Sequence, residues 1–306
     1  MAPYEVAIIG GGPAGLTAGI YAARAELNTV LFERAMPGGL AASTEFIENY
    51  PGFSEGIGGP ELTAQMEAQA RRFGLEIRNN NIESIKQENG LFVLDTDDGP
   101  VNARAVILAT GAQPQRLNVP GEETYHGRGV SYCATCDGAF FRNKQVAVVG
   151  GGDAAVEEAM FLTRFASRVY IIHRRGELRA TRIVQTRARQ NPRIEFIWHS
   201  VVEEILGDTG VTGVRIKDVR TGDTRRVPVD GIFIYVGFHP ASDLVKGLVE
   251  LDERGYVIAD DQMRTSCPGL FAAGDVRKKS LRQVVTAVAD GAIAAVSAER
   301  YLAENR

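Results

Sequence analysis

A short apolar run that ends in a glycine-rich turn occurs twice in this chain. Residues 6–9 lead into the turn 10–15, and residues 145–149 lead into the turn 150–155, 140 positions later. After each turn, a stretch of helical composition leads to another apolar run, so both segments predict a strand, a turn, a helix and a strand. Such units build parallel sheets covered by helices. We therefore expect an α/β protein with two domains of related plan.

The first turn has the pattern G-x-G-x-x-G, which is typical of dinucleotide binding. Gly10 permits a tight turn, Gly12 lets a pyrophosphate approach the backbone, and Gly15 lets helix and strand pack closely. Glu33 follows the second strand, where a carboxylate can bind ribose hydroxyls. The alternative is an ordinary turn of an α/β fold, but the complete order of strand, turn, helix, strand and acid favours FAD or NAD. The candidate binding residues are Gly10, Gly12, Pro13, Ala14, Gly15 and Glu33.

The second turn differs from the first in the residues that follow its second strand. His173, Arg174 and Arg175, with Arg179 four residues further on, stand where the first unit has Glu33. Arginine guanidinium groups suit a ribose 2′-phosphate, which indicates NADP. A solvated basic loop is the alternative interpretation. The candidate residues are Gly150, Gly152, Asp153, Ala154, His173, Arg174, Arg175 and Arg179.

A C-x-x-C motif lies between the two turns. Cys133 and Cys136 can close a small disulfide ring, and the carboxylate of Asp137 can move protons when that ring opens. Half of a zinc site and two unrelated buried cysteines are the alternatives. No second pair of cysteines or histidines completes four zinc ligands, so we expect no metal. With two dinucleotide sites, hydride can pass from a nicotinamide to a flavin, which favours a redox-active disulfide.

The overall composition sets the limits of these interpretations. A chain of 306 residues suits two domains, and its net charge of −4 gives no general attraction to nucleic acid or to anionic membranes. Three cysteines are too few for a disulfide-stapled secreted scaffold. No apolar run approaches eighteen residues, and the N-terminus shows no signal-peptide pattern. We expect a cytoplasmic protein that does not bind membranes or nucleic acid.

Short alternating strands interrupt both units. Residues 75–77, 82–85 and 91–96 predict an antiparallel meander inserted into the first domain, and residues 193–235 predict a second one. Residues 59–73 predict an amphipathic helix. The turns at 36–40 and 48–53 fit either a loop over a ligand or a plain surface loop.

Towards its end the chain returns to the first domain. Residues 105–111 predict a buried strand with a small-residue turn, and residues 265–275 predict a turn, a short strand and a Gly-Asp pair. A helix is expected from about 283 to 302, so Asp275 could bind a flavin ahead of that helix. Cys267 is interpreted as a structural thiol.

Taken in order and spacing, these motifs resemble those of the low-molecular-weight thioredoxin reductases. The resemblance covers nearly the whole chain and rests on residues 10–15, 49–52, 109–111, 133–138, 150–159, 173–175 with 179, and 272–275 with 282–283. It implies two Rossmann-like domains of three-layer ββα type. An FAD domain of residues 1–113 and 246–306 would carry an inserted NADPH domain, 114–245, that holds the C-x-x-C. It also implies a homodimer and a thioredoxin-like protein as substrate.

The resemblance further implies individual roles. Cys136 would face the flavin, Cys133 would attack the partner's disulfide, and Asp137 would act as acid and base. The residues placed around FAD are Gly39, Leu40, Asn49, Ala109, Thr110, Gly111, Gly274, Asp275, Arg282 and Gln283. Leu40 departs from the family, whose members commonly have Gln there, and this removes a possible hydrogen bond to the flavin.

These expectations describe a thioredoxin-disulfide reductase that passes electrons from NADPH through FAD and the Cys133–Cys136 disulfide. Two other classes use the same motifs. A flavoprotein oxidase or peroxide-system reductase would give the electrons to another acceptor, and a redox-sensing or nucleotide-binding protein would show no disulfide-dependent turnover. The sequence identifies neither the protein substrate nor the ratio of NADPH to NADH use.

Overall fold

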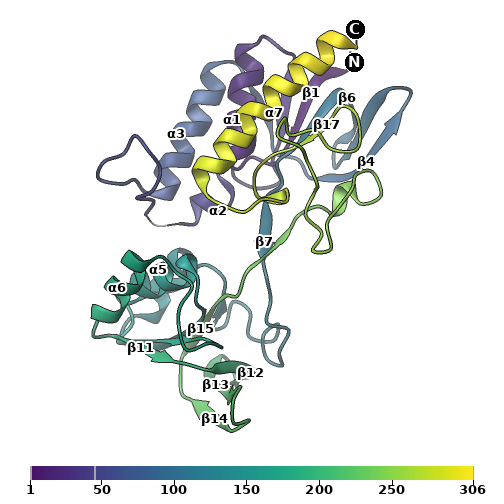
Figure 1. Ribbon diagram of the computed structural model, residues 1–306. Coiled ribbons are helices and arrows are strands. Elements are labelled where there is room, and N and C mark those ends of the chain that lie inside the picture. The colour runs from purple at the N-terminus through teal and green to yellow at the C-terminus, as the bar shows by residue number, and fades with distance from the viewer. Residues whose placement is uncertain (1, 45, 306) are drawn as a thin grey trace. The chain divides into compact units, whose positions relative to one another are not determined.

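The computed structural model describes residues 2–44 and 46–305, and its chain forms two compact units (Figure 1). The first unit comprises Met1–Gln113 and His239–Arg306, and the second comprises Pro114–Phe238. The sequence-based division put the second change of domain between residues 245 and 246. Residues 239–245 lie in the first unit instead. Ala241 bonds to the backbone of Gly111 and to the Thr110 hydroxyl, and Val245 is buried in the first unit's core.

The first unit is built on a parallel sheet with the order β3-β2-β1-β6-β17. Every strand of it runs in the same direction, so the carboxyl ends of all five meet at one edge. The strands are β1 Tyr4–Ile9, β2 Thr29–Phe32, β3 Glu76–Arg78, β6 Gly99–Leu108 and β17 Leu270–Ala272.

Alternating side chains of this sheet pack into two separate cores. Val6 and Ile8 face the helices, whereas Ala7 and Ile9 face the opposite layer, as the two-residue repeat of a strand requires. The helices on the first face are α1 Pro13–Arg24, α3 Gly59–Arg72 and α7 Val284–Glu304. This arrangement confirms the predicted α/β class.

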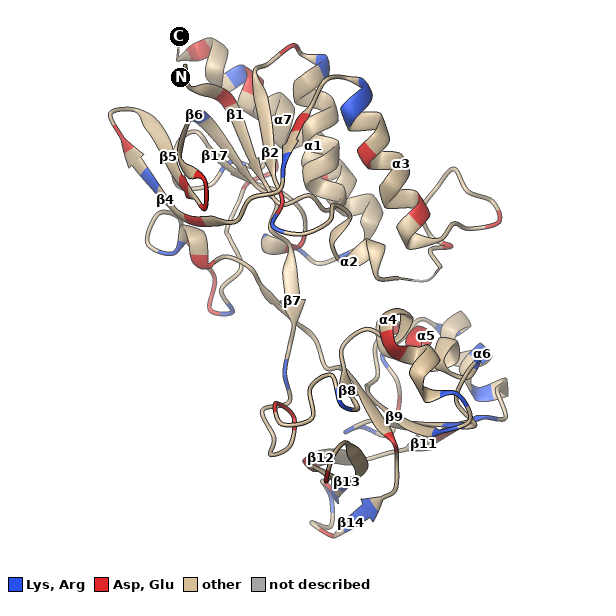
Figure 2. Cartoon of the chain, turned by 180° about the vertical axis from the view of Figure 1, so that it is seen from behind, with Lys and Arg blue, Asp and Glu red and all other residues tan. Residues whose placement is uncertain are grey.

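The opposite layer is an antiparallel hairpin that continues from β6 (Figure 2). Strands β4 Ile82–Glu88 and β5 Leu91–Thr96 pair with each other, and β5 pairs with the first half of β6. The prediction that residues 75–77 belong to this meander was wrong, because β3 pairs parallel with β2.

The second unit repeats the plan with a parallel sheet of order β11-β10-β9-β15-β8. Two helices, α5 Asp153–Leu162 and α6 Arg182–Gln190, pack on one face, and a three-stranded antiparallel sheet packs on the other. The parallel strands are β8 Val130–Ser131, β9 Gln145–Gly150, β10 Arg168–Ile172, β11 Ile194–Ile197 and β15 Gly231–Tyr235. The antiparallel strands are β12 Ser200–Gly207, β13 Val211–Asp218 and β14 Thr224–Val227.

The second predicted meander, residues 193–235, was therefore wrong at both ends. Only β12, β13 and β14 form it, whereas β11 and β15 are strands of the parallel sheet. β15 pairs with β8 and β9, which are distant in the sequence, and β11 pairs in parallel with the preceding strand β10. An apolar run carries no signal that distinguishes a parallel from an antiparallel pairing.

The two connections between the units are short strands that pair with each other. They are β7 Ala112–Pro114 and β16 Phe238–Pro240, and the Gln115 amide donates to the Gly237 carbonyl oxygen at 2.8 Å. Within the described residues, no helix is long and apolar enough to cross a membrane. The remaining short helices are α2 Gly39–Ala42, α4 Ala134–Asp137, η1 Gly138–Phe141, η2 Asp243–Val245 and η3 Gly274–Val276.

The contact between α1 and α7 gives a first prediction. A Cβ at Gly291 would overlap the backbone carbonyl of Ala14, which cannot move without shifting α1. Alanine normally stabilises a helix by about 1 kcal/mol over glycine, but overpacking costs about 1–3 kcal/mol. We expect Gly291→Ala to lower the free energy of unfolding, measured by urea titration with saturating FAD. Gly19→Ala is the control, since its Cβ would meet only the end of the Leu75 side chain. If Gly291→Ala lowered the free energy of unfolding no more than Gly19→Ala does, the close packing of α7 against α1 would be contradicted.

Candidate functional site

The predicted residues of the first unit lie at the carboxyl edge of its parallel sheet. The glycine turn follows β1, Glu33 follows β2, residues 109–111 follow β6, and Gly274 and Asp275 follow β17. Ligands of open α/β sheets bind at this edge, where the strand order changes direction. The fold therefore brings together segments that are far apart in the sequence.

The glycine turn after β1 is closely packed except at its middle glycine. Gly10 has a φ of +105°, and a Cβ at Gly15 would overlap the carbonyl oxygen of Gly10. At Gly12, by contrast, the nearest atom to a Cβ would be 4.0 Å away, on Gly39. Gly12 also precedes α1 with no side-chain cap, so the first amides of this helix remain available to an anion.

The carboxylate of Glu33 is fixed beside this turn. Its two oxygens accept hydrogen bonds from the Gly11 amide at 2.8 Å and from the Ala35 amide at 3.0 Å. Each oxygen keeps a further lone pair for a ligand hydroxyl. Glu33 therefore holds the position that the sequence predicts for a ribose-binding acid.

Asp275 and Arg282 contain buried polar atoms that make no hydrogen bond within the described residues. Among the described residues, neither Asp275 Oδ1 nor Arg282 Nε has a hydrogen-bond partner. Burial raises the pKa of Asp275, although the cations Lys279 and Arg282 oppose this effect. The Arg282 guanidinium lies 4.1 Å from the centre of the Tyr256 ring. Unpaired buried polar groups are costly, so these atoms fit the polar groups of a bound FAD.

The loop of residues 48–54 is tied to the start of α7. The Asn49 side-chain amide donates to the Gln283 side-chain oxygen at 3.1 Å, and Gln283 caps α7. A hollow of about 560 Å³ lies along this loop. Of the two residues after Gly38, Gly39 approaches Gly12, whereas the Leu40 side chain is exposed.

The second glycine turn has the same open middle position. Nothing lies within 4 Å of a Cβ at Gly152, which precedes α5 without a side-chain cap. The Arg179 and Ala180 amides donate to the Gly151 carbonyl oxygen, and Asp153 accepts from the Thr181 amide at 2.7 Å. The loop that carries the arginines is therefore folded back onto the turn.

The basic cluster of this loop is exposed, whereas its histidine is not. Arg174, Arg175 and Arg179 are exposed and make no ion pair with a described carboxylate. His173 is buried, and burial lowers its pKa together with the charges of the three arginines. This lowered pKa favours the neutral form of His173, and the arginines remain free to bind an anion such as a phosphate.

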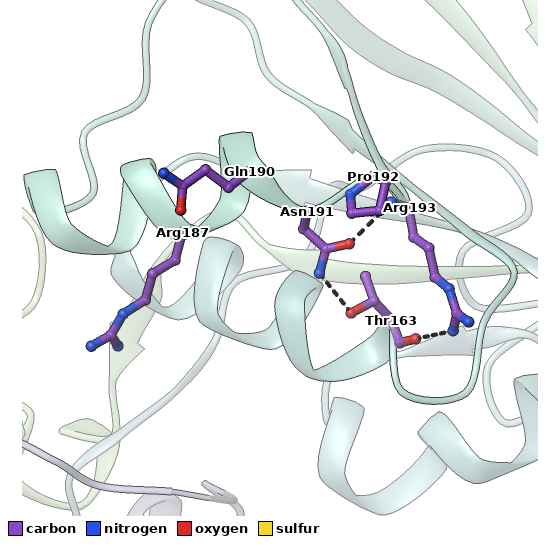
Figure 3. Close-up of a pocket in the computed structure, with 6 residues that line it drawn as sticks. All are labelled: Thr163, Arg187, Gln190, Asn191, Pro192 and Arg193. Atoms are coloured by element: carbon purple, nitrogen blue, oxygen red, sulfur yellow. Dashed lines mark hydrogen bonds between the residues drawn. The ribbon is translucent and has the colours of Figure 1, made fainter.

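A second hollow in this unit lies away from the predicted site (Figure 3). It has a volume of about 460 Å³ and lies at the end of α6 and the start of β11, the amino edge of the parallel sheet. Its polar groups already bond to each other: Asn191 donates to the Thr163 hydroxyl at 3.0 Å, and Arg193 donates to the Thr163 carbonyl at 2.6 Å. The predicted residues are at the opposite edge.

Cys133 and Cys136 form a disulfide with a Cα–Cα distance of 5.3 Å. Cys133 precedes α4, and its sulfur accepts a hydrogen bond from the Cys136 amide at 3.2 Å. This amide would stabilise a thiolate on Cys133 after reduction. Cys136 is the more exposed of the two, and Asp137 ends α4 in a half-buried position.

Two partly buried side chains of this unit carried no sequence-based prediction, Tyr235 beside α4 and Glu158 on α5. The Tyr235 hydroxyl accepts from the Ala134 amide, the first of α4, at 2.8 Å. Burial and the charge of Glu157 raise the pKa of Glu158 to about 7. Burial, and after it the charge of Glu158, raises the pKa of Tyr235. Among the described residues, Glu158 Oε2 has no hydrogen-bond partner. Glu158 lies within the motif 150–159, but an acid on a helix is usually interpreted as exposed.

Comparison with known proteins agrees with this geometry. The family signature of the pyridine nucleotide-disulphide oxidoreductases matches residues 4–291. The chain belongs to this family. It is 48% identical to a thioredoxin reductase of Listeria monocytogenes and 49% identical to one of Bacillus subtilis; each alignment covers 98% of this chain, and 94% and 95% of the relatives, respectively.

Solved structures of the family have the same fold. Lactococcus lactis thioredoxin reductase in its FR conformation is 49% identical, with a TM-score of 0.96 over 98% of this chain and 99% of that chain. The thioredoxin reductase of T. acidophilum is 37% identical, with a TM-score of 0.94 over the full length of both chains. The two Rossmann-like domains predicted from the sequence are confirmed.

The raised pKa of Glu158 predicts a pH dependence of stability. Its pKa rises from 4.5 to about 7 on folding, so the folded protein binds this proton more tightly. The associated stability is full below pH 4.5 and is lost as the pH rises through 7. The Glu158→Gln variant has no carboxyl group to ionise, so its stability does not fall in this way. We expect the difference in unfolding free energy between this variant and the parent to increase in favour of the variant between pH 5 and pH 8, by at most about 3 kcal/mol.

Urea unfolding of the oxidised protein at several pH values would check this. Asp208→Asn, in an exposed hairpin turn of the same unit, is the control for loss of one negative charge. A difference between Glu158→Gln and the parent that stays constant with pH would contradict the prediction.

Proposed function

We propose that this protein is an NADPH-dependent thioredoxin reductase with FAD in the first unit and NADPH in the second. The observation that carries this proposal is the Cys133–Cys136 disulfide. The same chain has two dinucleotide turns, one followed by the acid Glu33 and the other by a cluster of arginines. The similar proteins named thioredoxin reductase support it over nearly their full length. We also propose that the protein is a cytoplasmic homodimer. Analytical ultracentrifugation would check the mass of the dimer.

The first unit would bind FAD at the carboxyl edge of its sheet. The amides at the start of α1 would bind the pyrophosphate beside Gly12, and Glu33 would accept from ribose hydroxyls. Asp275 Oδ1 and Arg282 Nε would each gain a polar partner. When bound, FAD supplies the two-electron chemistry that links a nicotinamide to a disulfide.

The second unit would bind NADPH at the corresponding edge. Gly152 leaves room for the pyrophosphate at the start of α5. The three exposed arginines would bind the 2′-phosphate, which distinguishes NADPH from NADH. Asp153 holds the loop of these arginines through the Thr181 amide.

The disulfide would pass the electrons to the protein substrate. Two electrons and two protons convert the Cys133–Cys136 bond into two thiols, with Asp137 transferring a proton. The Cys133 thiolate then attacks one sulfur of the substrate disulfide, forms a mixed disulfide, and releases the other substrate sulfur as a thiolate. Cys136 attacks the Cys133 sulfur, which frees the reduced substrate and restores the original bond.

The proposal is tested by measuring NADPH oxidation by the purified yellow protein in the presence of a panel of thioredoxin-like disulfide proteins. We expect acceleration by at least one of them and none with Cys136→Ser, although NADPH should still bleach the flavin of that variant. Cys267→Ser, which removes a buried thiol that forms no disulfide, is the control. If Cys136→Ser oxidised NADPH at the parent's rate, electrons would leave the flavin to oxygen or to another acceptor, and the protein would be an oxidase.

The role of the basic loop is tested separately. A charge-assisted hydrogen bond is worth about 1.5–3 kcal/mol, and each 1.4 kcal/mol is a factor of ten. We therefore expect Arg174→Ala with Arg175→Ala to raise the KM for NADPH by at least about tenfold and to leave the KM for NADH nearly unchanged. Arg225→Ala, on the exposed face of β14, is the matched control. Equal increases for both cofactors would mean that the loop does not bind the 2′-phosphate.

A further inference from the structure

A buried carboxylate in the middle of α7 organises the segment that contains Asp275. Asp290 is 7% exposed, and its Oδ2 accepts from the Gly274 amide at 3.1 Å. It also forms ion pairs with Arg277 at 3.0 Å and with Lys279 at 2.9 Å, both of which are themselves largely buried. One side chain of α7 therefore holds three points of the segment 274–279.

Asp275 forms a longer ion pair with the same lysine, but it makes no hydrogen bond to it. The Lys279 ammonium is 2.9 Å from Asp290 Oδ2 and 3.8 Å from Asp275 Oδ1. Among the described residues, Asp275 Oδ1 is buried and has no hydrogen-bond partner. The two carboxylates thus compete for one cation, and Asp290 holds it.

The balance of charge explains why this competition matters. Three cations, Arg277, Lys279 and Arg282, lie close to the two carboxylates Asp275 and Asp290, and Arg277 and Lys279 are the two that pair with Asp290. A buried cation without a partner is strongly unfavourable. If Asp290 lost its charge, Lys279 would have Asp275 as its remaining ion-pair partner, and a hydrogen bond between them would occupy the oxygen that now accepts none.

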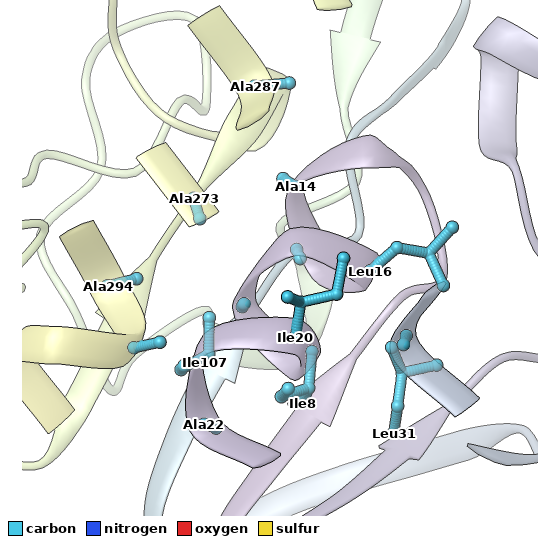
Figure 4. Packing of buried hydrophobic residues seen from close by; sticks show 14 of the residues in the cluster. Ile8, Ala14, Leu16, Ile20, Ala22, Leu31, Ile107, Ala273, Ala287 and Ala294 are labelled. Carbon is cyan, nitrogen blue, oxygen red and sulfur yellow. The ribbon is translucent and has the colours of Figure 1, made fainter. Parts of the chain in front are cut away.

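The same turn of α7 also contacts the start of α1. Gly291 follows Asp290 and lies so close to Ala14 that a Cβ would overlap the Ala14 carbonyl. Figure 4 shows Ala14 at the end of α1 that lies nearest to Ala273 and Ala287. Adjacent residues of α7 therefore position both the first turn of α1 and the Gly-Asp segment.

We propose that Asp290 is a positioning residue for FAD. It fixes the Gly274 amide and retains Lys279, and so it keeps Asp275 Oδ1 free to accept a hydrogen bond from a hydroxyl of FAD. This inference rests on the proposed FAD site of the first unit, and it adds a residue that does not itself touch the cofactor.

The test is the affinity of the protein for FAD, measured by removing the cofactor and titrating it back while following flavin fluorescence. Asp290→Asn can still accept from the Gly274 amide but cannot neutralise Lys279. Losing one hydrogen bond to a charged group corresponds to a weakening of about tenfold or more, which we expect for this variant. The double variant Asp290→Asn with Lys279→Gln removes the competing cation, so its affinity should return to within about threefold of the parent.

Two controls separate positioning from general stability. Ser297→Ala removes another buried polar group of α7, two turns further on, and should leave the FAD affinity unchanged. Lys279→Gln alone should also leave it unchanged, because Asp275 Oδ1 remains available to accept a hydrogen bond. The proposal is overturned if Asp290→Asn binds FAD as tightly as the parent, if the double variant is no better than the single one, or if Lys279→Gln alone loses affinity.

These outcomes are independent of the proposed reductase activity. A protein that binds FAD but reduces no disulfide substrate would refute the proposed function and leave the effect of Asp290 measurable. A parent protein that binds no FAD would refute both.

Discussion

The close contact between the end of β1 and the start of α1 is the constraint on which the first unit depends. Gly15 lies against the carbonyl of Gly10, so the helix begins directly at the carboxyl edge of the sheet. That position directs the first amides of α1 towards the same edge where β2, β6 and β17 end. Any side chain at residue 15 would move the helix away and separate the amides from the acids that complete the site.

The second unit reuses this arrangement with a different choice of charge. In the first unit, Glu33 follows β2 and accepts hydrogen bonds from backbone amides. At the corresponding position of the second unit, three exposed arginines follow β10. The backbone plan is common to both, so the difference in ligand arises from a few side chains after the second strand. The disulfide adds a third chemistry to the same unit. Two hydrogen bonds fix the start of α4 beside it, from the Ala134 amide to the Tyr235 hydroxyl and from the Cys136 amide to the Cys133 sulfur.

Much of this fold could be predicted from the sequence because its signals are local. The glycine turns, the helix of residues 59–72 and the acid or arginines after the second strands are patterns within thirty residues. The placements of β3, β11 and β15 could not be predicted, since they depend on which other strand each one pairs with and in which direction. An apolar run of three to five residues satisfies a meander and a parallel sheet equally well.

Buried charge is the part of the site that sequence patterns describe least well. Asp275 follows a recognisable Gly-Asp turn, but Asp290 lies in an alanine-rich helix where a single acid resembles a solvated residue. Its partners Arg277 and Lys279 resemble a basic surface turn for the same reason. Only the fold shows that the three are packed together beneath an unpaired carboxylate oxygen. Because a buried charge is tolerated only with its partner, such a group specifies one arrangement of its neighbours, and the residues that set a cofactor site include some that never contact the cofactor.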